Sequence, residues 1–158
     1  MKYYWFGQGA AALLVFASSA IAAETPIAVS GIVTHPLTLS SADLHGFPVV
    51  SVSSTQVSGR GPVKLDCRGV SVKAILDKAV LTLGTGLNPS LSHTVLITAD
   101  DGYQVALSMG ELDPDYGNAG AIIATDCNGQ PLDAPRLVVP HDGHGGRAVR
   151  GVVKIEVK

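Results

Sequence analysis

A hairpin signal in the second half of the chain constrains its fold more than any other feature. Residues 93–108, HTVLITADDGYQVALS, hold an apolar run, an Asp-Asp-Gly turn and a second strand-forming run. A tight turn between two such runs is typical of paired antiparallel strands. Residues 47–57 add a second strand pattern, because apolar and hydroxyl side chains alternate along them. A domain built mainly on sheets is therefore expected.

One helix stands out against these β-rich runs. An apolar stripe at helical spacing predicts a helix over residues 69–84, with Ser71 as its cap and Gly84 or Gly86 as its end. A short turn near residue 40 has Ser40 or Ser41 as its expected N-cap. Further strands are predicted within residues 26–33, 37–44, 58–67, 121–132, 135–140 and 147–157. The expected fold class is a β-dominated α+β domain with one principal helix.

The first 22 residues have the pattern of a secretory signal peptide. A basic Lys2 precedes an apolar run from Ala10 to Ile21, and Ala20-Ile21-Ala22 fits a small-x-small cleavage site. The run is shorter than the roughly 20 residues that a membrane-spanning helix needs. We therefore expect residues 23–158 to form a single exported domain, periplasmic or secreted and not embedded in a membrane.

Charge and cysteine usage narrow the partners of this mature domain. After cleavage, 10 basic residues face 13 acidic ones, and a net negative domain lacks the basic footprint that nucleic-acid binding requires. The only two cysteines are Cys67 and Cys127. In an oxidising compartment they can pair as a disulfide. Two buried thiols, or one thiolate bound to a metal, are the alternatives, and spacing alone does not decide among them.

The segment HDGHGGR, residues 141–147, gathers the most chemistry in the shortest span. His141, Asp142 and His144 are metal-ligand types, but no second ligand pair in the sequence completes a four-ligand site. A solvated glycine-rich loop is the simpler reading. Arg147 closes the segment, and an arginine beside backbone N–H groups can hold a phosphate or a polar heterocycle. No nucleophile motif accompanies it: a triad of Ser108, His141 and Asp101 would be an arbitrary choice.

Four ordered segments resemble the molybdopterin-binding domain of the sulfite oxidase family. They are CRGVSVKAIL, DDGYQVALSMGELDP, AIIATDCNGQPL and PRLVVPHDGHGGRAVRGVVKIEV, and the resemblance runs from Thr38 to Lys158. It implies a sulfite oxidase-like α+β fold with a pterin cleft made largely from loops. Arg147 matches an arginine near the cofactor in that family, and Arg136 matches another frequent arginine.

The resemblance departs from the catalytic members at one point. Their molybdenum is held by a cysteine well upstream of the helix, whereas Cys67 lies only two residues before Gly69 and Cys127 sits in a turn. Bound molybdenum is therefore doubtful, and so is oxygen-atom transfer. The chain is also similar to small periplasmic pterin-binding members that lack this cysteine and report to the periplasmic part of a membrane signalling protein.

This resemblance implies a non-catalytic pterin sensor or carrier. Its implied contacts are Asp142 and Arg147, because a carboxylate suits the aminopyrimidine edge of a pterin. Arg136 or Tyr103 would flank the ring, and His141 and His144 would be edge contacts. Two other functions stay open: a molybdopterin-dependent oxidoreductase, and a protein-interaction scaffold that holds no cofactor.

Overall fold

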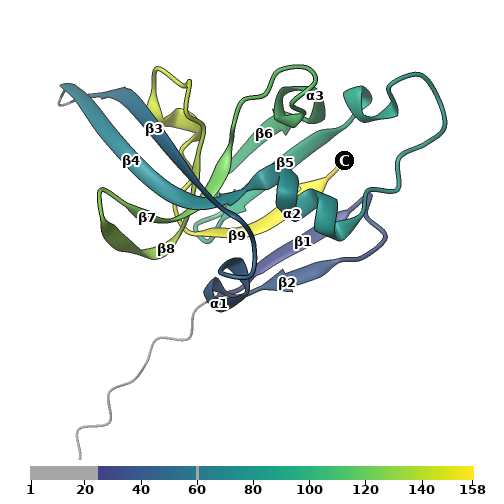
Figure 1. Cartoon of the computed structure of the whole chain (residues 1–158), viewed down its shortest axis with the longest axis horizontal. Helices are drawn as coiled ribbons and strands as arrows, with labels where there is room; N and C mark the ends of the chain where they lie inside the picture. Colours follow the sequence, from purple (N-terminus) through teal and green to yellow (C-terminus); the bar gives the residue numbers. More distant parts are fainter. Residues whose placement is uncertain (1–24, 60) are drawn as a thin grey trace, which may run out of the picture.

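Two β-sheets form the body of the protein in the computed structural model, which describes residues 25–59 and 61–158 (Figure 1). The first sheet has the strand order β2-β1-β9-β5-β6, and the second has the order β3-β4-β7-β8. The predicted signal peptide, residues 1–22, lies outside the described residues. The strands of the first sheet are β1 (Ile27–Gly31), β2 (Leu37–Leu39), β5 (Thr94–Ala99), β6 (Gln104–Ser108) and β9 (Val152–Val157). Those of the second are β3 (Val49–Ser58), β4 (Gly61–Ser71), β7 (Ile122–Cys127) and β8 (Gln130–Val138).

The hairpin predicted from residues 93–108 is confirmed as β5 and β6. These strands pair antiparallel from Thr94 opposite Ser108 to Thr98 opposite Gln104. Gly102 in the turn has φ +85°, which a glycine adopts without a steric penalty. The last strand, β9, lies between β5 and β1 and runs parallel to β1. The chain end is thereby built into the middle of the first sheet.

The second sheet carries a long hairpin made of β3 and β4. Residues 47–57 were expected to form a strand, and β3 confirms this, but β4 covers eleven residues where only a short strand was expected. The β7–β8 turn is Asn128-Gly129, with φ of +55° and +74°, as a tight two-residue hairpin turn requires. Cys67 lies opposite Cys127 on β4 and β7, and a disulfide joins them.

The principal helix is shorter than the sequence pattern predicts. It is α2, Val72–Ala79, rather than residues 69–84. Residues up to Ser71 stay in β4, where Ser71 pairs with Ile122, and the Ser71 side chain makes no capping hydrogen bond. At the other end Val80 has φ +56°, which stops the helix before either predicted glycine. The apolar periodicity was correct for the face, since Ile75 and Leu76 are fully buried.

The main core fills the space between the two sheets and α2. It combines Ile97 and Ile155 of the first sheet with Ile123 of the second. A smaller cluster lies on the other face of the second sheet: Leu65, Cys67, Ile122, Ala124, Cys127 and Val138. Among the described residues, no helix is long and apolar enough to cross a membrane. The β-dominated α+β architecture expected from the sequence is thus confirmed.

Short helices with complete capping boxes flank the sheets. The first, α1 (Ser41–Leu44), is capped by Ser40, in line with the expected turn. The second, α3 (Met109–Leu112), follows β6 directly, and its cap is Ser108. In each box the serine side chain accepts from the N3 backbone while the N3 carboxylate accepts from the serine N–H. Ser108 therefore has a local structural role.

Candidate functional site

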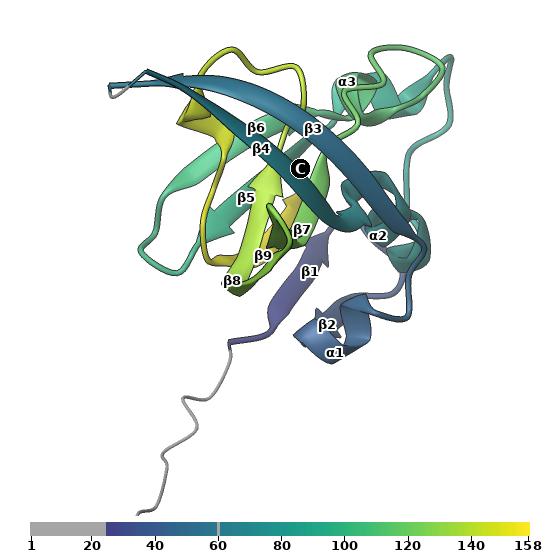
Figure 2. The same cartoon turned by 60° about the vertical axis from the view of Figure 1, so that its left-hand side comes forward.

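The loop between β8 and β9 folds back against the outer half of the β3–β4 hairpin (Figures 1 and 2). The Val57 N–H donates to the Gly143 carbonyl at 2.8 Å, and Val57 bridges to His144. Further along, the Leu137 N–H donates to the Val149 carbonyl at 2.8 Å. The HDGHGGR segment thus spans from the end of β8 to the edge of β3. Arg147 ends a short 3-10 turn, η2 (Gly145–Arg147), and the last strand starts later than predicted, at Val152.

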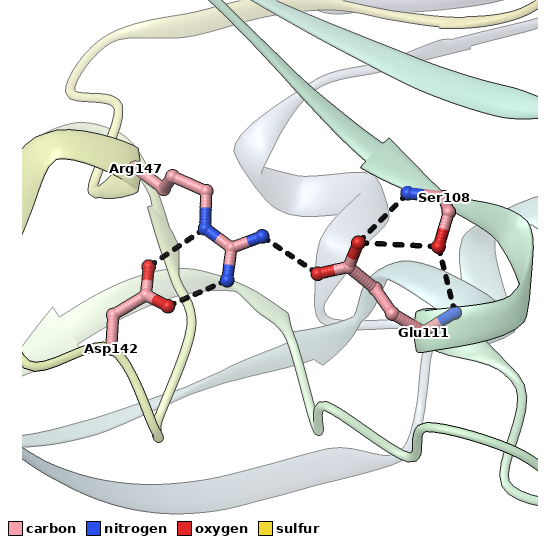
Figure 3. A network of polar contacts seen from close by, with 4 residues as sticks. All are labelled: Ser108, Glu111, Asp142 and Arg147. Atoms are coloured by element: carbon pink, nitrogen blue, oxygen red, sulfur yellow. Dashed lines mark hydrogen bonds and ion pairs between the residues drawn. The ribbon is translucent and has the colours of Figure 1, made fainter.

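Arg147 pairs with two carboxylates, Asp142 of its own loop and Glu111 of α3, which follows β6 (Figure 3). Its Nε and Nη2 donate to both oxygens of Asp142, at 2.9 and 2.6 Å. Its Nη1 donates to Glu111 at 2.6 Å. Glu111 is itself fixed by the α3 capping box, where the Ser108 N–H donates to its other oxygen at 2.9 Å. A bidentate arginine between two held carboxylates defines one loop geometry. We call Arg147, Asp142, Glu111 and Ser108 the Arg147 clasp.

The ionisation of the clasp follows from these contacts. Burial raises the pKa of Glu111, but the Ser108 N–H and the Arg147 guanidinium together outweigh burial, so its pKa lies below its ordinary value. The hydrogen bonds to Asp142 contribute most to raising the pKa of Arg147, and Glu111 adds to them. Tyr103 supports the same loop, because its hydroxyl donates to the Gly146 carbonyl at 2.7 Å. Every charged member of the clasp therefore has a partner of opposite charge.

Beside the clasp, the same loop covers a cleft of different character. Its volume is about 230 Å³. The cleft lies between the outer part of the hairpin, the middle of β8 and the loop. It is lined by Gln56, Val57, Val63, Leu65, Arg136, Gly145, Ala148 and Arg150. We call it the Arg136 cleft.

Two of the residues that line the Arg136 cleft have buried donors without a partner among the described residues. Gln56 is only 5% exposed, and its Nε2 makes no hydrogen bond. The buried Nε of Arg136 also makes none. Burial, and secondarily the charge of Arg150, lower the pKa of Arg136. Unpaired buried donors destabilise a fold by about 1–3 kcal/mol each, so they call for an explanation.

The six sequence-predicted contacts divide between these two places. Asp142, Arg147 and Tyr103 belong to the clasp and its support, and none of them lines the Arg136 cleft. Arg136 lines the cleft, whereas His141 and His144 are exposed on the loop. The sequence-based prediction assigned no contact to Gln56 or Arg150, which also line the cleft. The sequence held one signal for Gln56. Apolar and hydroxyl residues alternate along residues 47–57, and the polar Ser54 and Gln56 occupy positions where this alternation predicts apolar side chains.

Other features carry less chemistry. Within residues 25–59 and 61–158, no group of three or more His, Cys, Asp or Glu side chains is arranged to hold a metal ion. A larger hollow of about 480 Å³ lies beside Arg68 and Asp126. These two side chains already pair with each other at 2.9 Å. The hollow thus lacks the unpaired buried donors that distinguish the Arg136 cleft.

Comparison with solved structures places this architecture in a class of fold, the sulfite oxidase-like fold. One solved structure with a similar fold is the sulfane dehydrogenase SoxCD from Paracoccus pantotrophus, with a TM-score of 0.68. The match covers 84% of this chain at 19% identity, and 37% of the SoxCD chain. This chain thus spans little more than a third of its neighbour's length, and the likeness establishes the fold alone. No protein-family model and no curated protein sequence matches the chain.

Proposed function

We propose that this protein is an exported pterin-binding protein that acts as a sensor or carrier rather than as an enzyme. The observation that carries the proposal is that Gln56 and Arg136, two residues that line the Arg136 cleft, each have a buried donor without a partner among the described residues. The carbonyl oxygen and ring nitrogens of a pterin are acceptors, and its amino group is a donor. An arginine and a glutamine amide together match both kinds of group.

The fit of a pterin is also supported by the size and walls of the cleft. Its volume of about 230 Å³ lies below the ~300–1,000 Å³ of pockets that enclose drug-sized ligands. A single small heterocycle suits it better than an extended cofactor. Apolar side chains of Val57, Val63 and Leu65 face it beside the polar ones, as the faces of a flat ring require. SoxCD, whose fold is similar, is a sulfane dehydrogenase.

A molybdenum held by a cysteine thiolate does not fit these residues. The chain has two cysteines, and both are committed to the Cys67–Cys127 disulfide. A cysteine sulfur binds a metal as a free thiolate, which a disulfide does not provide. We therefore propose no redox step, and the role of the protein is to bind its ligand and present it. The periplasmic domain of a membrane signalling protein is the proposed receiver.

In this proposal the Arg147 clasp positions the binding site and does not contact the pterin ring. Arg147 donates three hydrogen bonds to Asp142 and Glu111. These bonds fix the loop that carries Gly145 and Ala148 over the cleft. Pterin recognition is accordingly assigned to Arg136 and Gln56, and not to Asp142 and Arg147.

The test is to measure the pterin and the molybdenum bound to the protein isolated from its native cell envelope. We expect pterin fluorescence after release and oxidation, near one equivalent per chain, without stoichiometric molybdenum by mass spectrometry. Arg136→Gln should lower the pterin content, whereas Arg68→Gln, which removes a cation outside the cleft, should not. Stoichiometric molybdenum would contradict the proposal and favour an oxidoreductase. The absence of both species would favour a cofactor-free scaffold.

A further inference from the structure

The edge strand β3 is open to pairing with a further strand. It lies at one end of the second sheet, and within the described chain no strand pairs along its other side. Its sequence, VVSVSSTQVS, holds no charged residue and no proline, and its register with β4 runs from Val49 to Ser58 without a bulge. Exposed edges of natural sheets normally carry charges, prolines or bulges that prevent pairing with another chain. None of these devices is present along β3.

The other sheet edges of the described chain are shorter or protected. The opposite edge of the second sheet is β8, which contains Pro131, Asp133 and Pro135. Its inner half is also bridged to the segment before β9, at residues 136 and 150. In the first sheet the edge strands β2 and β6 have three and five residues. The ten residues of β3 are therefore the longest edge that can accept a further strand.

One contact of β3 identifies the backbone groups that point away from β4. The Val57 N–H donates to the Gly143 carbonyl in the β8–β9 loop, so it points to the outer side. Pro62, which has no N–H, lies opposite Val57, as expected for a pair that exchanges no backbone hydrogen bonds. Residues two apart in a strand direct their backbone groups to the same side. The other outward-directed residues of β3 are Val49, Ser51, Ser53 and Thr55.

We propose that β3 pairs antiparallel with β3 of a second copy of this chain, about a two-fold axis through Val52. This register places Val49 opposite Thr55. It also places Ser51 opposite Ser53, so every outward N–H and C=O between residues 49 and 55 meets a partner. The pairing ends where the β8–β9 loop already occupies the edge. The two four-stranded sheets then form one continuous sheet, and this dimer does not depend on the proposed function.

The side chains of β3 suit a second copy of the same strand. Because the strand is uncharged, the two-fold pairing brings no like charges opposite each other, which would destabilise it. Val52 faces its own counterpart in a non-hydrogen-bonded pair, where side chains approach most closely. It is only partly buried and packs against the cluster of Leu65 and Cys67, so a second Val52 extends the cover of this cluster. Each copy uses its free edge, and the assembly closes at two chains.

The test measures the mass of the protein from its native cell envelope by sedimentation equilibrium at several concentrations. The double variant Val49→Lys, Thr55→Lys puts lysine opposite lysine across the proposed interface. Its matched control, Val49→Glu, Thr55→Lys, puts glutamate opposite lysine. Both side chains are exposed, and urea unfolding checks that the variants fold. We expect wild type and control to approach twice the chain mass, and the lysine pair to raise the dissociation constant of the dimer at least about tenfold.

Amide hydrogen exchange of the wild type gives a second test, which decides if the variants do not fold. The amides of Ser51, Ser53 and Thr55 should be protected at high protein concentration and exchange faster on dilution. The Val57 amide should stay protected at every concentration, because Gly143 of the same chain accepts its hydrogen bond. The proposal is overturned by a wild-type mass of one chain at all concentrations, by equal dissociation constants of the two double variants, or by exchange at the three amides that does not change with concentration.

Discussion

Arg136 lies in β8 and Arg147 in the loop that follows this strand, yet their surroundings are opposite. Arg147 meets two carboxylates with good hydrogen-bond geometry. Arg136 meets another arginine and keeps a buried donor unpaired. A satisfied charge contributes to the geometry of a fold, whereas an unsatisfied one is stabilised only when something else supplies the partner. In the proposed function, Arg147 therefore positions the loop, and Arg136 is the arginine that contacts the ligand.

Removing Arg147 should have the largest effect on stability. Arg147→Met leaves Asp142 and Glu111 without their common partner, and hydrogen bonds to charged groups contribute about 1.5–3 kcal/mol. Because the Arg147 side chain is 37% exposed, solvent screening reduces this, and we expect a loss of about 2 kcal/mol in urea unfolding. Arg68→Met, at an exposed pair, should lose clearly less than Arg147→Met. Equal losses would show that the clasp is an ordinary surface ion pair.

Glu111 makes the contribution of the Arg147 clasp to stability depend on pH, and the direction of this dependence follows from its pKa. The folded-state pKa of Glu111 lies below its ordinary value of 4.5, so its contribution is present at neutral pH and is lost as the pH falls below that value. Glu111→Gln should be less stable than the wild type by about 1 kcal/mol at pH 7. The gap should narrow at pH 3.5. A gap that stays constant with pH in urea titrations would mean that the charge of Glu111 does not matter.

In the Arg136 cleft we expect a substitution to raise the free energy of unfolding, whereas substitutions in the Arg147 clasp lower it. Gln56→Leu removes a buried, unpaired amide, and replacing such a group with an apolar one of similar shape is neutral or stabilising. We expect the ligand-free protein to gain about 0.5–1 kcal/mol in urea unfolding while ligand binding weakens. Gln130→Leu, an exposed site on β8, serves as the control and should change stability by less than about 0.5 kcal/mol. A clear destabilisation by Gln56→Leu would show that the amide has a structural partner.

The smallest effect is expected where the loop meets Gln56. An alanine Cβ at Gly145 would lie 3.2 Å from Gln56 Oε1, whereas one at Gly146 meets nothing within 4 Å. Gly→Ala at an unstrained site stabilises by about 0.4–1 kcal/mol through the unfolded chain. Gly146→Ala should show this gain in thermal unfolding, and Gly145→Ala should not. Equal gains would mean that the Gln56 side chain gives way freely.

Local features of the fold could be predicted from the sequence, and features that join distant segments could not. The β5–β6 hairpin and the Ser40 cap depend on residues within a few positions of each other. The clasp joins Arg147 to Glu111 across 36 positions, and the cleft joins Gln56 to Arg136 across the sheet. No periodic pattern in the sequence indicates these contacts between distant segments. The sequence resemblance singled out the loop of residues 141–147 but could not show that Arg147 and Asp142 are paired with each other.

The helix boundary failed for a similar reason. The apolar stripe continued past Ala79, but Val80 adopts a positive φ, and hydrogen bonds from Thr34 and His35 to Val80 and Ala79 replace the next helical turn. Those partners come from a segment more than forty residues earlier. Propensity favoured a longer helix, and tertiary contacts ended it.

The Cys67–Cys127 disulfide affects the stability of the fold that forms the Arg136 cleft. It closes a loop with a sequence separation of 60 residues, which restricts the unfolded chain by an entropy equivalent to about 4 kcal/mol in the loop-closure model. That amount is similar to the destabilisation expected from two or three unpaired buried donors. The disulfide therefore offsets, in the denatured ensemble, the destabilisation that the unpaired donors cause in the native state.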